Sequence, residues 1–374
     1  MTDQETLYAI ALSLTPSVGL IARKTLLETF GSATAVYENR GRIQDTIPSV
    51  HPRMVEALAG MDAHLGRAEQ EMEFAEKGRI QIIGFTDDEY PKRLAQCADA
   101  PTVLYYRGTS SLNERHIVSM VGTRNITGYG KDFCARFVKD LSNLCPDILL
   151  VSGLAYGVDV HCHRAALDNG MATIGVLAHG LEQIYPTMHR DTASKMTTCG
   201  GLLTEFASHT KIDKHNFIQR NRIVAGMSDA TVVVESAAKG GALITAEIAN
   251  DYDREVFAVP GRVYDTYSKG CNRLIRDNKA CMLEDASQLV NVMGWQTDAK
   301  RKETLKNGVQ QEMFVELSED EKHVMSYMKQ GENVSVNILV AKSGFPISKI
   351  SSLMFSLEMK GLVRPAVGGS FRLV

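Results

Sequence analysis

Residues 117–168 decide the fold, and they read IVSMVGTRNITGYGKDFCARFVKDLSNLCPDILLVSGLAYGVDVHCHRAALD. Two apolar runs, Ile117–Val121 and Ile148–Val151, are each followed by Gly, Ser or Thr and then by an amphipathic segment. Continuous apolar strands that alternate with helices predict a parallel sheet covered by helices on both faces. In such sheets ligands bind at the carboxyl ends of the strands.

The same alternation extends over residues 78–293, which we expect to form one α/β domain with a mostly parallel sheet. The predicted strands are Ile80–Ile83, Ile117–Val121, Ile148–Val151, Ala172–Leu177, Leu202–Glu205, Thr231–Val234, Glu255–Val259 and Ala280–Leu283. Helices are predicted between them, for example Lys131–Leu144 and Asp159–Asp168.

Residues 1–65 form a predicted helical module of the helix-hairpin-helix or SAM-like kind. Leu7, Ile10 and Leu14 recur at helical spacing, and the turn at residues 15–19 separates them from a second helix. Such a hairpin can offer backbone amides to a phosphate. It can equally be a small packing module, which we favour because the glycine pattern of the hairpin is incomplete.

The end of the chain changes character twice. Residues 294–312 are polar and lack periodicity, so we expect a linker. Residues 313–374 follow the winged-helix order of three helices and a hairpin, predicted at Glu319–Met328, Val336–Lys342, Ser348–Met359 and Leu362–Val374. This region is nearly neutral, whereas a duplex reader is normally basic. We therefore favour an interaction or accessory role over reading of the major groove.

Composition excludes several broad classes. The chain has 374 residues, is 44% hydrophobic and 23% charged, and carries a formal net charge of −3. These values are typical of a soluble globular protein of two or three domains. They give no global signature of nucleic-acid binding, although a local basic groove remains compatible with them.

Membrane, secreted and metal-binding classes also lack support. No apolar run approaches the roughly 18 residues of a membrane span, and the N-terminus lacks the layout of a signal peptide. The seven cysteines are scattered and include no C-x-x-C pair, which favours a reducing compartment over a disulfide framework or a zinc site. We expect a cytoplasmic protein with no metal and no cofactor.

Two predicted strand ends carry residues suited to an anion. Gly122, Thr123 and Arg124 follow the first, where a glycine permits close approach and an arginine can grip a phosphate. Ser152 and Gly153 follow the second and lead to a helix that we expect Asp159 to cap.

A third motif spans residues 211–222, where four basic residues and one acid give a local charge of +3. Phe217 lies among them. Cations for phosphates with a ring for a base are typical of single-strand binding, in which stacking contributes about 1–3 kcal/mol per base. The alternative is a solvated helix start with Phe217 in the core, and this motif alone does not decide between the two.

A fourth turn contains Gly240 and Gly241 between a strand and a helix. Each glycine turn is weak evidence by itself, because tight strand–helix turns need glycine for steric reasons. Four such turns on one edge of the sheet are more than this steric requirement explains, so together they favour an anion-binding site. No P-loop and no G-x-G-x-x-G fingerprint is present, and we predict no catalytic residue.

Together these motifs resemble the DNA processing protein A family (DprA, also called Smf), from about residue 85 to residue 282. The motifs that carry the resemblance are Val121–Arg124, Ser152–Asp159, His163–Leu167, Gly180-Leu181, Tyr185-Pro186, Phe217, Arg220–Ile223, Leu243–Ala246 and Arg254–Gly261. The chain departs from the family where Ala178 replaces a common Gly, Ile218 a common Pro and Gly240 a frequent Ser.

The resemblance implies a Rossmann-like domain that binds single-stranded DNA as a homodimer. We expect that the protein is not an enzyme, because the sequence contains no convincing catalytic set. It also implies protection of incoming strands during natural transformation and loading of the RecA recombinase on them. The DNA-binding residues that it implies are Gly122, Thr123, Arg124, Ser152, Gly153, Lys214, Phe217, Arg220, Asn221, Arg222, Gly240 and Gly241.

Two other functions remain open from the sequence. The same strand-end turns would suit a nucleotide sensor or a nucleotide N-glycoside hydrolase, with Glu235 or Glu247 as the acid–base group. A third interpretation is a protein-docking scaffold that uses the winged helix.

Overall fold

A computed structural model describes residues 1–47, 50–295, 317–328, 334–360, 362–366 and 370–373. The chain divides into two compact units, Met1–Thr297 and Asp298–Val374. Each unit has a hydrophobic core of its own.

The first unit is built on a nine-stranded sheet with the order β1-β2-β6-β5-β4-β3-β7-β8-β9. Strands β3 to β9 pair in parallel, whereas β1 and β2 are antiparallel. The strands are Gln81–Gly84, Val103–Gly108, His116–Val121, Ile148–Ser152, Thr173–Val176, Gly200–Thr204, Ala230–Val233, Glu255–Ala258 and Cys281–Met282. The expectation of a mostly parallel α/β sheet is thus confirmed. Strand β2 is the one strand of this sheet that was not predicted from the sequence.

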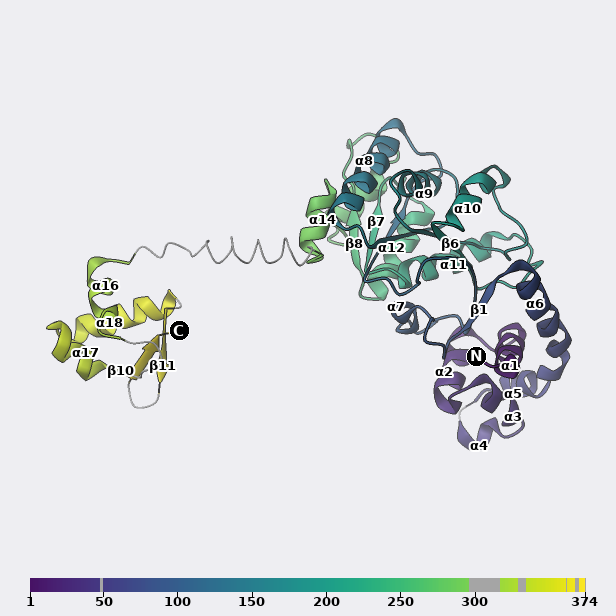
Figure 1. Cartoon of the computed structure of the whole chain (residues 1–374), viewed down its shortest axis with the longest axis horizontal. Helices are drawn as coiled ribbons and strands as arrows, with labels where there is room; N and C mark the ends of the chain where they lie inside the picture. The colour runs from purple at the N-terminus through teal and green to yellow at the C-terminus, as the bar shows by residue number, and fades with distance from the viewer. Residues whose placement is uncertain (48–49, 296–316, 329–333, 361, 367–369, 374) are drawn as a thin grey trace. The chain divides into compact units, whose positions relative to one another are not determined.

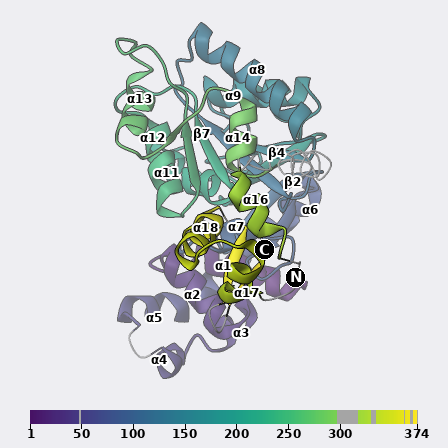
Figure 2. The same cartoon turned by 90° about the vertical axis from the view of Figure 1, so that its left-hand side faces the viewer.

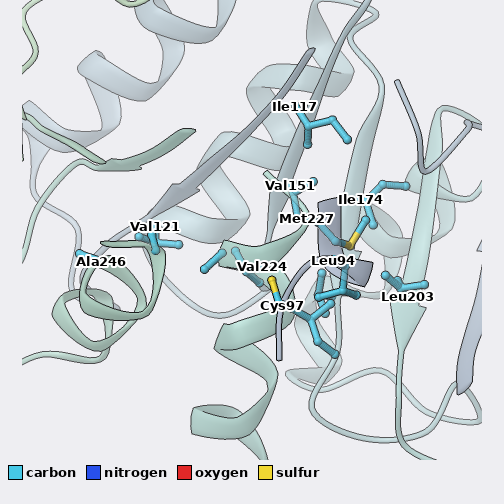
Figure 3. Packing of buried hydrophobic residues seen from close by; sticks show 14 of the residues in the cluster. Leu94, Cys97, Ile117, Val121, Val151, Ile174, Leu203, Val224, Met227 and Ala246 are labelled. Atoms are coloured by element: carbon cyan, nitrogen blue, oxygen red, sulfur yellow. The ribbon is translucent and has the colours of Figure 1, made fainter. Parts of the chain in front are cut away.

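The central strands are buried on both faces because their side chains alternate between two cores. Ile117 and Val121 of β3 enter one core, whereas Val118 and Met120 enter the other. Figure 3 shows part of the first core, to which the sheet contributes Ile117, Val121, Val151 and Ile174 and the helices contribute Leu94 and Val224.

Helices cover both faces of the sheet. The first core is closed by α7 (Lys92–Ala95), α11 (Lys214–Gly226), α12 (Gly241–Asp251) and α13 (Lys269–Arg276). The second core is closed by α8 (Gly128–Leu144), α9 (Val158–Asp168) and α14 (Ala286–Val292). Beside the sheet, α10 (Arg190–Met196) packs on α9.

An N-terminal group of helices packs at one end of the same unit, around β1 and β2 (Figures 1 and 2). It consists of α1 (Asp3–Leu14), α2 (Leu20–Phe30), α3 (Ala33–Glu38), α4 (Ile43–Thr46), α5 (Pro52–Ala59), a 3-10 turn at Met61–His64 and α6 (Leu65–Gly78). Strand β2 is shared: Val103 and Tyr105 face the helical module, whereas Leu104 and Tyr106 face the core of the sheet.

Buried polar contacts also join the helical module to the sheet. The Lys24 ammonium of α2 donates to the carbonyls of Ala95 and Cys97, at 2.9 Å each. The buried carboxylate of Glu71 in α6 accepts from the Ser208 amide at 2.9 Å. The module and the sheet therefore form one packed body.

The second unit has the expected winged-helix architecture. It contains α16 (Glu319–Met325), α17 (Val336–Ser343), α18 (Ile347–Met359) and a three-stranded sheet of β10 (Val334–Ser335), β11 (Val363–Ala366) and β12 (Ser370–Leu373). The predicted linker, residues 294–312, falls outside the described residues from 296 on.

No single helix in the described part of the chain is both long and apolar enough to cross a membrane. The helices Val336–Ser343 and Ile347–Glu358 pass that test only as a pair, bent by 114° at their break.

Candidate nucleic-acid interface

A groove lies at the carboxyl ends of β3 and β7, where the glycine turns meet the start of α11 and α12. Nine of the residues predicted from the sequence line it: Gly122, Thr123, Arg124, Lys214, Phe217, Arg220, Asn221, Gly240 and Gly241. Three do not: Ser152, Gly153 and Arg222. This is the edge at which parallel sheets bind ligands.

Exposed cations surround the groove from three elements. Arg124 follows β3 and Lys214 begins α11, and both side chains are exposed. Lys239, which the sequence reasoning missed, is also exposed and lines the groove from the turn before α12. The sequence could have indicated Lys239 as a groove residue, because it directly precedes Gly240 in the fourth glycine turn. Asp213 is the acid beside Lys214, and it accepts from the His215 amide at 2.7 Å as the N-cap of α11.

Three aromatic residues line the groove, namely Tyr185, Phe217 and Tyr267. Phe217 is half-buried, and its ring meets that of Tyr185 edge-on with 6.1 Å between centroids. The Arg124 guanidinium lies over the Phe217 ring at 5.4 Å. Phe217 therefore lies in the groove wall and not in the core, which was the alternative left open by the sequence. A base entering here meets a ring and a cation together.

A buried arginine forms the floor of the groove. Arg220 is 4% exposed, and its Nη1 donates to the Val176 carbonyl at 2.6 Å. A Cβ on Gly153 would lie 1.8 Å from that nitrogen, so Gly153 serves to admit the guanidinium. Burial lowers the pKa of Arg220, and the charge of Asp159 opposes this effect. The floor of the groove thus carries the positive charge of Arg220, whose buried guanidinium is fixed by the Val176 carbonyl and by the close approach of Gly153.

Asp159 has a different role from the one expected. Gly157, and not Asp159, is the N-cap of α9. The prediction was wrong because the Asp159 carboxylate lies within the first helical turn, where it accepts from the Ala155 amide at 3.3 Å. Burial raises the pKa of this carboxyl, and the nearby Arg220 charge lowers it.

Two predicted DNA-binding side chains point away from the groove. The buried Ser152 hydroxyl donates to the Met120 carbonyl at 2.6 Å. Arg222 is 4% exposed, donates to the Asp99 carbonyl at 2.6 Å and pairs with the carboxylate of Glu205. Both groups are engaged inside the protein, so neither is available to a strand in the groove.

The glycines of the turns differ in what they provide. A Cβ on Gly122 would lie 2.3 Å from Val158, so this glycine lets β3 and α9 approach closely. The Thr123 amide next to it donates to the Glu235 carbonyl at 2.7 Å and is not free for an anion. At Gly241, by contrast, an added Cβ would meet nothing within 4 Å. The start of α12 is therefore open at Gly241, and the first amides of a helix can bind a phosphate.

The candidate acid–base groups are explained by structural contacts. Glu235 is buried and accepts from both the amide and the hydroxyl of Thr127, at 2.9 and 2.6 Å, at the N-terminus of α8. Glu247 is exposed and lies 3.9 Å from Lys279, outside the groove. Burial lowers the pKa of His163 to about 3, so this imidazole is neutral near pH 7.

Metal-ligating side chains do not cluster in the described part of the chain. Within those residues, no group of three or more His, Cys, Asp or Glu side chains is placed to hold an ion.

The chain is similar to known proteins along most of its length. Residues 81–294 match the family model of DNA recombination-mediator protein A. The chain belongs to the DprA family. Residues 315–369 match the DprA winged helix domain, which agrees with the architecture of the second unit.

Individual DprA relatives extend this similarity. The chain is 28% identical to protein Smf of Synechocystis over 98% of both chains. It is similar to the X-ray structure of DNA processing protein A from Streptococcus pneumoniae, at 30% identity and a TM-score of 0.64 over 76% of this chain and 97% of that one.

A second solved structure is also similar to this chain. It describes the single-stranded DNA binding mode of DNA processing protein A from Helicobacter pylori. This chain is 26% identical to it, with a TM-score of 0.52 over 57% of this chain and 95% of that one.

Proposed function

We propose that the chain binds single-stranded DNA in the groove without reading its sequence and catalyses no reaction on it. The observation that carries this proposal is that the exposed cations Arg124, Lys214 and Lys239 line one groove together with the half-buried ring of Phe217. The Arg124 guanidinium lies over that ring. Cations that contact phosphates together with rings that stack on bases bind a single strand of any sequence. The groups on this edge contact phosphates and base faces, whereas sequence is read at base edges.

The biological role that we infer follows from this chemistry and from the family. The protein would bind incoming single strands during natural transformation, protect them, and load the RecA recombinase on them. It would do so in the cytoplasm as a homodimer. Protection is measured as survival of labelled oligo-dT against a nuclease, loading as RecA filament formation on strands already covered by a single-strand binding protein, and the dimer as the mass of the protein in solution.

Salt dependence tests the electrostatic part of the proposal. With three exposed cations contacting phosphates, the logarithm of affinity for oligo-dT is expected to fall with the logarithm of salt concentration with a slope of about −2 per subunit. The measurement is fluorescence anisotropy over a salt series with the full-length protein. A slope near zero would contradict the proposal.

Arg124→Ala tests the site itself. It removes a charged contact and the cation over Phe217, so affinity is expected to fall roughly 10-fold or more for every sequence tested. The slope should shrink by about 0.7. Lys139→Ala is the matched control, since Lys139 is an exposed cation of α8 that does not line the groove. Equal losses in the two variants, or a loss that depends on sequence, would overturn the assignment.

A further inference from the structure

The loop that follows β8 presents an exposed aromatic side chain on the same edge of the sheet as the groove. Tyr264 is 92% exposed and its neighbour Val263 is 74% exposed. Large apolar side chains grouped in this way on a surface mark interaction sites more often than isolated ones do.

The base of this loop is fixed although its tip is exposed. The Asn272 side chain bonds both backbone groups of Gly261, at 3.1 and 2.9 Å. The Tyr129 hydroxyl donates to the Pro260 carbonyl at 2.8 Å. The Tyr267 carbonyl accepts from the Ser236 amide at 2.7 Å. The tip is therefore held out from the protein by contacts at both ends of the loop.

The loop is continuous with the groove. Tyr267 lines the groove, and its carbonyl is anchored to Ser236 in the turn that precedes α12. The loop also borders a second hollow, whose lining includes Tyr129, Arg262 and the acid Asp265. A strand that leaves the groove past Tyr267 thus enters a surface with further rings and a further cation.

The charge and chemistry of this surface suit a nucleic acid. Arg262 and Lys269 are exposed at the two ends of the loop, and Asp265 is the acid between them. Exposed tyrosines beside arginine offer stacking to bases and a cation to phosphates. A protein partner would use the same apolar tip but would not require continuity with the groove.

We propose that the loop is a second subsite for single-stranded DNA, in which Tyr264 stacks on a base and Arg262 contacts a phosphate of the nucleotides that have left the groove. This inference rests on the proposed function. It adds that the bound strand is longer than the groove and that its outer part is held by Tyr264.

The length of the strand separates the two subsites. Affinities of the full-length protein are measured on an oligo-dT series from about 4 to about 16 nucleotides, the range of site sizes in single-strand binding folds. Tyr264→Ala should match the wild type on the shortest oligonucleotides that bind. It should lose roughly 5- to 150-fold on the longest, the loss of one stacked base. Tyr264→Phe keeps the ring and should restore the affinity.

A strand that lacks bases separates stacking from charge. On oligonucleotides with abasic sites in their outer part, Tyr264→Ala should behave as the wild type, whereas Arg262→Ala should still weaken binding. Because Tyr264 is 92% exposed, its replacement should leave the thermal unfolding midpoint unchanged.

The outcomes that overturn the inference differ from those that overturn the groove. If Tyr264→Ala changes no affinity at any length, or reduces all lengths equally, the second subsite is wrong. If it leaves every oligonucleotide unaffected but reduces RecA loading, the loop binds protein and the inference is likewise wrong. If Arg124→Ala leaves all lengths unaffected, the groove itself is wrong, whatever Tyr264 does.

Discussion

At the scale of single residues, the floor of the groove depends on the absence of one methyl group. Gly153→Ala would place a Cβ 1.8 Å from Arg220 Nη1, so the buried guanidinium must shift. The bond to the Val176 carbonyl must then break. We expect a stability loss of about 1–3 kcal/mol, the cost of an unsatisfied buried group, and weaker binding to oligo-dT.

The measurements are the free energy of unfolding in urea and anisotropy on the same preparation. Gly128→Ala is the control, since a Cβ there would meet nothing within 4 Å. If Gly153→Ala were as stable as the wild type, Arg220 would be less tightly held than its contacts indicate.

At the scale of elements, α11 has two faces with different functions. Lys214, Phe217 and Asn221 line the groove, whereas Arg222 turns toward Glu205 inside the protein. Lys214→Ala should therefore reduce the salt slope by about 0.7 without loss of stability. Arg222→Ala should leave the salt slope unchanged. It should cost about 3–5 kcal/mol of stability, because the buried carboxylate of Glu205 loses its ion-pair partner.

Two measurements check this division: the salt series and urea unfolding, made on both variants. A reduced slope in Arg222→Ala, measured where the variant is fully folded, would return this residue to the DNA-binding set. Burial raises the pKa of Glu205 even in the wild type, so loss of Arg222 should also favour protonation of that carboxyl.

At the scale of the whole molecule, the groove lies entirely in the unit Met1–Thr297. The second unit has its own core, which includes Val324, Leu339 and Ile350. Removing residues 298–374 should therefore leave affinity for oligo-dT within about twofold, as expected for independent parts. A loss of about tenfold or more would show that the winged helix takes part in binding the strand.

The sheet could be predicted because the sequences of its central strands are strongly apolar. The run that became β4 is apolar from Ile148 to Val151, and the run that became β3 is interrupted only by the buried Ser119. Such runs are typical of strands covered on both faces. Strand β2 was missed although Val103–Tyr106 is a comparable run. It belongs to an antiparallel pair outside the strand–helix alternation that guided the prediction.

The candidate site could be predicted in part for a related reason. Residues 214, 217, 218 and 221 recur at helical spacing, and all four line the groove. Counting charges could not separate Lys214 from Arg222, since a sequence does not show which cation finds a buried carboxylate. Gly153 shows the same limit: a glycine near an anion site can serve the ligand or make room for a side chain.

The shared strand β2 has a consequence for how the protein can be divided. The family model begins at residue 81, yet Val103 and Tyr105 are covered by helices that precede it. A homologue that inherited the sheet without those helices would need other side chains on that face of β2, because exposed Tyr and Val there would favour aggregation. The segment that matches the family model and the segment that folds as one body therefore have different borders in this chain.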